Sequence, residues 1–296
     1  MAAAVLQEPL AVRSPAASDY WELTKPEINL LIGIATFTGF YLGSRASGFR
    51  FVLLIHTLFG TLLVSSGAAT LNQYVERRFD ALMRRTRRRP LASSTLDPLS
   101  ALRFGILLSV AGCAYLAIAV NALASLLAIL TLTGYLFLYT PLKRRTPLCT
   151  LVGAIPGAMP PLIGWAAATG KLNFDAWILF AMLFLWQFPH FMAIAWMYRE
   201  DYARAGYLVL PQDERSGRFM SSQALVTSLA LIPVSLIPAL NAHTFYLVLN
   251  GVLSAWLFYY GASLAFHRSA LAARRLLTAS IIYLPMVFFL IAIEKF

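Results

Sequence analysis

The sequence predicts an all-α, polytopic membrane protein with nine transmembrane helices and a cytoplasmic N-terminus. Of its 296 residues, 59% are hydrophobic and only 12% are charged, which leaves too little polar surface to cover a soluble domain. Its apolar stretches have the length, about 20 residues, that a helix needs to cross the hydrocarbon core. Its positive charges also gather between alternate stretches, as they do in chains that cross the bilayer repeatedly.

Nine apolar stretches are the candidate spans, and polar or turn-forming residues separate them. Short turns at Asn121 and Asn241 divide two pairs of stretches. The fifth stretch contains GAIPGAMPPLIGW, and its glycines and prolines predict an irregular helix packed closely against a neighbour. In chain order, the predicted spans are 28–47, 51–71, 98–119, 121–141, 149–169, 174–197, 222–241, 244–265 and 275–293.

The distribution of Lys and Arg predicts the orientation. If the N-terminus is cytoplasmic, 20 of the 24 basic residues lie on the cytoplasmic side, and the exceptions are Arg45, Arg50, Lys171 and Lys295. The net charge of +11 therefore follows from membrane orientation, and no nucleic-acid partner is expected.

The N-terminal residues predict the domain organisation and the membrane. We expect a short cytoplasmic tail over 1–22 and a single transmembrane domain over 23–296. The tail has neither the apolar core of a signal peptide nor the arginines of a transit peptide. This favours a bacterial plasma (inner) membrane over the mitochondrial inner membrane.

The end of the second span carries the first group of candidate site residues. Asn72, Glu76 and Asp80 stand at i, i+4 and i+8, so on a helix their side chains share one face. Oxygen ligands of this kind suit Mg²⁺, which takes its remaining ligands from water and substrate phosphate. Five arginines follow closely and can grip the same anion by bidentate hydrogen bonds: Arg84, Arg85, Arg87, Arg88 and Arg89. The pattern indicates a diphosphate site. The alternative is a cytoplasmic loop that obeys the positive-inside rule, with the two carboxylates paired to Arg77 or Arg84.

The sixth span ends in a second polar group, LWQFPHFMAIAWMYREDYARAGY. Gln187 and His190 lie within the span, where polar side chains usually face the bundle interior or a cavity and mark a functional site. The alternative for His190 is a hydrogen bond between helices, and for the aromatic residues an interfacial belt. Both polar groups follow even-numbered spans, so we expect them to emerge on the same side and to face one another.

These residues resemble the intramembrane prenyltransferases of the UbiA superfamily. The N-D-x-x-D-x-x-x-D motif of that superfamily appears here as Asn72, Gln73, Glu76 and Asp80, with Glu76 in place of the commoner Asp. The M-x-R-T-x-x-R-P-L tail that follows is matched by these residues: Met83, Arg85, Thr86, Arg89, Pro90 and Leu91. The resemblance runs from LTKP at 23–26 to the ninth span and implies a UbiA-type helical bundle.

The second polar group resembles the haem-specific branch, the protoheme IX farnesyltransferases or haem O synthases. Most of the superfamily carries a second acidic D-x-x-x-D pair there, whereas this chain has Tyr198 and Tyr202 at that spacing. The branch pattern is matched instead by these residues: Trp186, Pro189, His190, Phe191, Tyr198, Arg199, Asp201 and Tyr202. The chain departs from it at Gln187–Phe188, where a Pro often precedes Pro-His.

The resemblance implies that a farnesyl group passes from farnesyl diphosphate to the 2-vinyl group of haem B with addition of water, giving haem O and diphosphate. It implies Mg²⁺ and catalysis at Asn72, Glu76 and Asp80. Diphosphate-binding residues are expected to be Lys25, Arg85, Arg89 and Lys143. Haem-binding residues are expected to be Trp186, His190, Tyr198, Arg199 and Tyr202. Haem B is thus a substrate, membrane lipid surrounds the protein, and haem A synthase is a candidate partner.

Two other functions compete with this interpretation. One is a UbiA-type prenyltransferase that acts on a quinone precursor or another tetrapyrrole. The other is a membrane transporter, which predicts polar residues near mid-bilayer in several spans. The acidic residues of this chain instead lie near span ends, which argues against transport.

Overall fold

The computed structural model describes residues 16–45, 48–211, 216–238 and 244–293, and these residues form helices joined by turns. Two short helices, α1 (Ala17–Leu23) and α10 (Arg199–Arg204), accompany the longer ones. The longer helical segments are α2 (Pro26–Gly43), α3 (Phe51–Asp80), α4 (Pro98–Ala119), α5 (Ala122–Thr133), α7 (Cys149–Gly157), α8 (Pro160–Thr169), α9 (Phe174–Met197), α11 (Arg218–Leu236), α12 (Thr244–His267) and α13 (Ala270–Ile293). A π-helical turn, η1 (Gly134–Tyr139), and the single turn α6 (Thr140–Leu142) continue α5.

The predicted all-α membrane fold is confirmed. Eight helical segments of the described residues are long and apolar enough to cross a membrane, when α5 to α6 and α7 to α8 are each taken as one span. The remaining predicted span corresponds to α2, an 18-residue helix that packs against α3 and α8. The protein is therefore a multi-pass membrane protein.

Capping residues mark the starts of two helices whose predicted boundaries agree with the structure at both ends. Asp97 accepts a hydrogen bond from the backbone N of Ser100 and Pro98 begins α4, while Asn173 accepts one from Ala176 at the start of α9. Both helices have the predicted bounds. The Asn241 turn and the first 15 residues of the predicted tail lie outside the described residues. The last residues of that tail belong to α1.

The fifth predicted span is irregular, as expected, and its break lies between α7 and α8. Pro160 and Pro161 cannot donate the backbone hydrogen bonds that would continue α7. Close packing against α2 accompanies the break, since a Cβ on Gly164 would clash with the carbonyl oxygen of Thr36. Only glycine fits there, because the two backbones touch.

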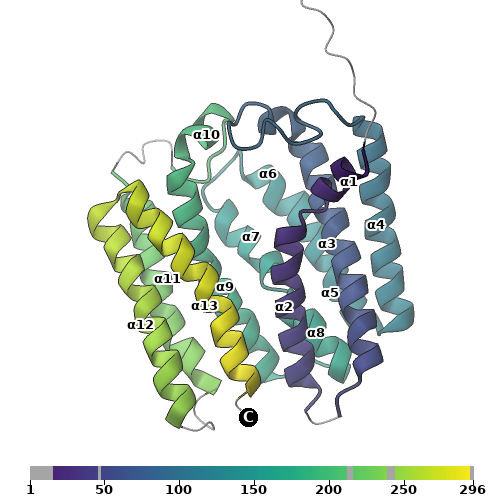
Figure 1. Cartoon of the computed structure of the whole chain (residues 1–296), viewed down its shortest axis with the longest axis vertical. Helices are drawn as coiled ribbons and strands as arrows, with labels where there is room; N and C mark the ends of the chain where they lie inside the picture. The colour runs from purple at the N-terminus through teal and green to yellow at the C-terminus, as the bar shows by residue number, and fades with distance from the viewer. Residues whose placement is uncertain (1–15, 46–47, 212–215, 239–243, 294–296) are drawn as a thin grey trace, which may run out of the picture.

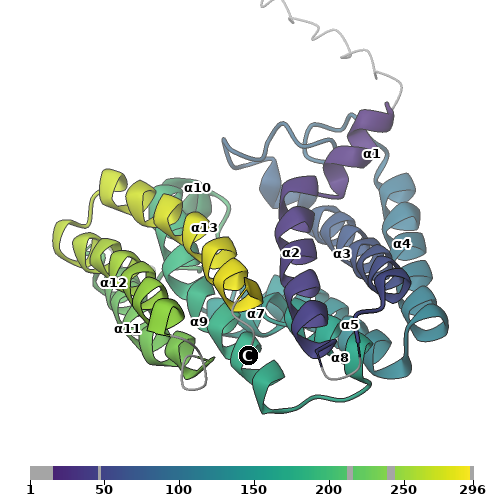
Figure 2. The ribbon, with the colours of Figure 1, turned by 60° about the horizontal axis from the view of Figure 1, so that its bottom comes forward.

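The helices form two groups that share one polar end. Helices α9, α11, α12 and α13 pack together, and α2, α3, α4, α5 and α8 form the second group (Figures 1 and 2). Figure 1 shows α1, α10 and the connection from α3 to α4 at the same end of the bundle. The polar ends of α3 and α9 therefore lie on the same side, as predicted.

Candidate active site

Helix α3 runs past its apolar part to Asp80, and this extension carries the predicted column of polar side chains. Asn72, Glu76 and Asp80 are all buried, with exposed fractions of 1%, 6% and 1%. Two carboxylates are rarely buried without partners, because removing a charge from water is costly. Their partners therefore define the site.

Each member of the column contacts a cation from another segment. Lys143 Nζ, just after α6, lies 2.8 Å from Glu76 Oε1, and Arg89 Nη1 lies 2.9 Å from Asp80 Oδ2. Lys25 Nζ, at the start of α2, lies 3.4 Å from Asn72 Oδ1. Three parts of the chain thus bring cations to one face of α3.

The pairing differs from the alternative drawn from the sequence, in which Arg77 or Arg84 neutralised the carboxylates. The guanidinium of Arg77 donates to the carbonyl of Tyr74 at 2.6 Å and lies over the Tyr74 ring, and Arg84 is exposed. The predicted pairing of the carboxylates with Arg77 or Arg84 is therefore wrong. The turn after α3 brings the guanidinium of Arg89 to Asp80 instead.

The cations respond differently to burial. Burial alone would lower the pKa of Lys143. The Glu76 carboxylate opposes this effect, and the pKa of Lys143 lies well above its usual range. Burial and the positive charges of Arg89 and Lys143 together lower the pKa of Lys25 to about 7. Lys25 is therefore only partly protonated near neutral pH, and an anion bound beside it would favour its charged form.

The column keeps an oxygen that suits a metal ion. Asp80 Oδ1 is buried and accepts no hydrogen bond from the described residues. Within the same residues, no three His, Cys, Asp or Glu side chains are grouped so as to hold a metal by themselves. Two carboxylates and an amide fit Mg²⁺ only if water and a phosphate complete its shell.

Two further residues at this site were missed from the sequence. Asn72 Nδ2 donates to Thr140 Oγ1 at 3.1 Å, and Thr140 Oγ1 donates to the carbonyl of Tyr135 at 2.8 Å. Lys143 Nζ lies 4.6 Å from the centre of the Tyr139 ring. Both residues lie in the run YTPLK, of which only Lys143 was predicted to be a site residue.

The polar ends of α3 and α9 are joined by a buried carboxylate. Asp201 is 7% exposed, accepts a hydrogen bond from the backbone N of Arg85 at 3.2 Å and pairs with Arg204. The guanidinium of Arg85 lies 4.9 Å from the centre of the Tyr198 ring. Of the predicted diphosphate-binding residues, Lys25, Arg89 and Lys143 contact the column, whereas Arg85 contacts the α9 side.

The predicted haem-binding residues of α9 face α13. Trp186 Nε1 donates to the carbonyl of Ser280 at 2.7 Å, and His190 Nδ1 lies 2.9 Å from Ser280 Oγ. The His190 ring stacks on Trp186 with 4.8 Å between centroids. The hydrogen bond between helices that was the alternative for His190 is therefore present.

The remaining predicted haem-binding residues lie at the end of α9. The guanidinium of Arg199 is exposed, lies 4.6 Å from the Trp196 ring centre and donates to the Trp196 carbonyl. Tyr202 packs its ring against Tyr207. Within the described residues, the side chains of the column pair with Lys25, Arg89 and Lys143 and not with Arg199 or Tyr202.

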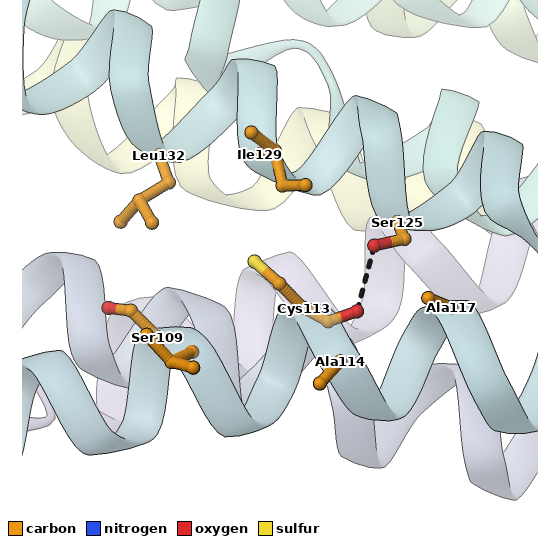
Figure 3. A pocket seen from close by; sticks show the side chains of 8 residues that line it. Ser109, Cys113, Ala114, Ala117, Ser125, Ile129 and Leu132 are labelled. Atoms are coloured by element: carbon orange, nitrogen blue, oxygen red, sulfur yellow. Dashed lines mark hydrogen bonds between the residues drawn. The ribbon is translucent and has the colours of Figure 1, made fainter.

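A cavity away from the charged column lies between α4 and α5. It has a volume of about 440 Å³ and an apolar wall that includes Cys113, Ser125 and Ile129 (Figure 3). Ser125 Oγ donates to the Cys113 carbonyl at 2.8 Å, so its few polar groups pair with each other (Figure 3). This cavity has no charged group and is not a candidate for the chemistry.

Comparison with protein families gives a clear match. The profile of the UbiA prenyltransferase family matches residues 32–291. The protoheme IX farnesyltransferase of Solibacter usitatus is 48% identical over 94% of this chain and 98% of its own length. That of Koribacter versatilis is 41% identical over 97% of this chain and 98% of its own.

Solved structures share the fold. A digeranylgeranylglyceryl phosphate synthase covers 93% of this chain and 97% of its own, with a TM-score of 0.73 and 18% identity. A UbiA homologue from Archaeoglobus fulgidus, solved with GPP and Mg²⁺, covers 93% of this chain and 99% of its own, with a TM-score of 0.60 and 16% identity. The chain thus shares its arrangement of helices with these solved structures.

Proposed function

The chain belongs to the UbiA prenyltransferase family, and from this we propose that it is a prenyltransferase that transfers a farnesyl group to haem B. The donor is farnesyl diphosphate, and the products are haem O and diphosphate. The acceptor follows from the relatives named protoheme IX farnesyltransferase, which are up to 48% identical and match nearly the whole chain.

The single observation that carries the diphosphate half of this proposal is the charged column on α3. Three basic side chains contact one buried face of α3, and a bound anion would accept hydrogen bonds from them and favour the charged form of Lys25. A diphosphate is such an anion and is recognised by charge-assisted hydrogen bonds, worth about 1.5–3 kcal/mol each. We assign this binding to Lys25, Arg89 and Lys143, with Arg85 close by on the α9 side.

Asn72, Glu76 and Asp80 are the residues that would hold Mg²⁺, as one homologue structure contains Mg²⁺ with GPP. The ion would neutralise charge on the diphosphate and so make it a better leaving group. The cations of the chain support the same step, because they stabilise the negative charge that grows on the diphosphate oxygen as its bond to farnesyl C1 breaks.

Farnesyl C1 then reacts with the acceptor. The electron pair of the C1–O bond leaves with diphosphate, and the 2-vinyl group of haem supplies the pair that forms the new C–C bond. Water adds to the resulting cation and loses a proton. The aromatic rings of Trp186, Tyr198 and Tyr202 would exclude bulk water and stabilise positive charge on this path.

The end of α9 is the proposed haem side. It replaces an acidic pair with tyrosines, and this suits an acceptor that carries two propionates, which further carboxylates would repel. Arg199 is a candidate propionate partner because its guanidinium is exposed. His190 is proposed to contact haem or to ligate its iron.

The proposed setting is a bacterial plasma membrane. The multi-pass fold fits any membrane, and the positive-inside pattern supports a cytoplasmic position for the charged column. A relative from Arabidopsis thaliana that is named mitochondrial is 37% identical to this chain, and the bacterial relatives named above are 48% and 41% identical. Haem A synthase, as the protein that receives haem O, stays a prediction.

The test is an assay of purified protein in detergent with haem B, farnesyl diphosphate and Mg²⁺, read by mass spectrometry. We expect a haem product heavier by one farnesyl group plus water, and no product without divalent metal. Parallel reactions offer 4-hydroxybenzoate in place of haem B. A prenylated benzoate with no haem product would overturn the acceptor and leave the family assignment intact.

A further inference from the structure

Tyr207 lies beside the charged column, and its ring is fixed by packing. It follows α10, after a turn in which Gly206 adopts a φ of 68°, and its backbone N donates to the carbonyl of Tyr202 at 2.9 Å. The side chain is only 6% exposed and packs with Met83 and Ala205. Its ring centroid lies 6.0 Å from that of Phe79, the residue before Asp80.

The hydroxyl of Tyr207 is buried and makes no hydrogen bond of good geometry with the described residues; the Glu76 carboxylate lies nearby, but it pairs with Lys143. Such a group is costly, since it loses water without gaining a replacement. Phenylalanine would make the same ring contacts without this cost. A hydroxyl kept at such a place indicates a partner that arrives from outside the chain.

The charges around Tyr207 indicate what that partner is. The next residue, Leu208, donates its backbone N to the carbonyl of Lys143, whose ammonium pairs with Glu76. A tyrosine hydroxyl keeps its proton near neutral pH, so that of Tyr207 can act as a donor. The donors Lys143 and Arg89 already pair with carboxylates, whereas the Tyr207 hydroxyl can serve an anion without breaking an ion pair.

We propose that the Tyr207 hydroxyl donates a hydrogen bond to the diphosphate group of the prenyl substrate. This inference rests on the proposed function, specifically on diphosphate binding at the α3 column. It makes Tyr207 a substrate-binding residue on the α9 side, opposite the metal-binding face of α3. The diphosphate group is then bound between the ends of α3 and α9, by the cations on one side and by the neutral Tyr207 hydroxyl on the other.

The test compares Tyr207→Phe with Tyr283→Phe in the full-length protein. Tyr283 in α13 is also buried, and its hydroxyl pairs with Ser254, away from the column. Calorimetric titration with inorganic diphosphate and Mg²⁺ should show about tenfold weaker binding for Tyr207→Phe, as expected for one hydrogen bond to a charged group. Haem binding should be unchanged, and Tyr283→Phe should match the wild type in both titrations.

A second measurement keeps the Tyr207 ring and hydroxyl in place. With 3-fluorotyrosine at 207, the ¹⁹F resonance should shift when diphosphate and Mg²⁺ are added, whereas the label at 283 should not respond. An unshifted resonance, or Tyr207→Phe binding diphosphate within twofold of the wild type, would overturn the inference.

These outcomes are separable from those of the farnesyl transfer assay. If the wild type makes haem O and Tyr207→Phe binds diphosphate normally, the proposed function stands and the role of Tyr207 fails. If Tyr207→Phe loses diphosphate affinity but the wild type makes no haem product, the role of Tyr207 stands and the acceptor fails.

Discussion

At the end of α3, Glu76 and Asp80 each pair with a cation carried by another segment of the chain. At the end of α9, tyrosines occupy the acidic positions common in the family, and the buried carboxylate of Asp201 pairs with Arg204 three residues away. The first end thus gathers unlike charges from the start of α2, the segment after α6 and the turn after α3. The second gathers aromatic rings, and its buried carboxylate bonds to nearby Arg204 and to the backbone N of Arg85 in the turn after α3.

The ends of α3 and α9 therefore suit different kinds of ligand. The Glu76–Lys143 ion pair joins residues 67 apart and forms only when the helices pack, and the charged cluster on α3 suits a small, highly charged group. Aromatic residues and exposed arginines on the α9 end offer a broad, weakly charged surface. This suits a large planar acceptor with a few negative groups, as proposed above. Variants at the two ends should therefore fail in different ways.

The largest effect is expected for Asp80→Asn. The change removes a carboxylate that faces Arg89 and offers the buried Oδ1 to a metal, so catalysis loses both the metal and the ordered arginine. Farnesyl transfer should fall about 100- to 1,000-fold, comparable to the loss of one strong electrostatic contact to the transition state. Mass spectrometry of the haem product measures it. Asp175→Asn, at the exposed start of α9, is the matched control and should keep full activity.

Lys143→Gln should be the next most severe change. It leaves Glu76 buried without its cation and removes a donor for diphosphate, so the KM for farnesyl diphosphate should rise about 10- to 100-fold. Lys143→Arg keeps the charge and should recover part of the affinity. Arg103→Gln removes an exposed cation of α4 and serves as the control. Equal KM values for farnesyl diphosphate in Lys143→Gln and Arg103→Gln would contradict the proposed role of Lys143 in diphosphate binding.

Asp201→Asn tests the connection between the two ends. The variant weakens the contact with the backbone N of Arg85 and the pair with Arg204, so the free energy of unfolding should fall by about 1–3 kcal/mol. We expect kcat/KM to fall about tenfold, because the turn that carries Arg89 loses its support. Thermal unfolding and steady-state kinetics measure the two effects. Glu200→Gln changes the exposed neighbouring carboxylate, and a similar loss there would contradict the specific role of Asp201.

His190→Ala should have the smallest effect on the α3 end and a selective effect on the acceptor. Loss of the imidazole should weaken haem binding about fivefold and change the haem absorption spectrum, while diphosphate affinity stays constant. Ser280→Ala removes the hydroxyl that contacts His190 but leaves the imidazole, and it should keep most of the haem affinity. Unchanged haem affinity and spectrum in His190→Ala would contradict the proposed haem contact.

Much of the fold was determined by the sequence alone. Apolar runs of bilayer length set the number and order of the spans, because a helix in lipid must satisfy its own backbone groups. Capping residues such as Asp97 and Asn173 fixed helix starts to the residue. The column of Asn72, Glu76 and Asp80 also followed directly, since a spacing of four residues places side chains on one helix face.

Only the tertiary structure decided which groups meet that column. Lys143 is 67 residues from Glu76, and Tyr207 is farther still from Asp80, so no local spacing relates them. Arg77 is adjacent to Glu76, yet its guanidinium turns to the carbonyl of Tyr74. Helix periodicity is a property of the local chain, whereas the partners of a buried charge depend on how distant helices pack.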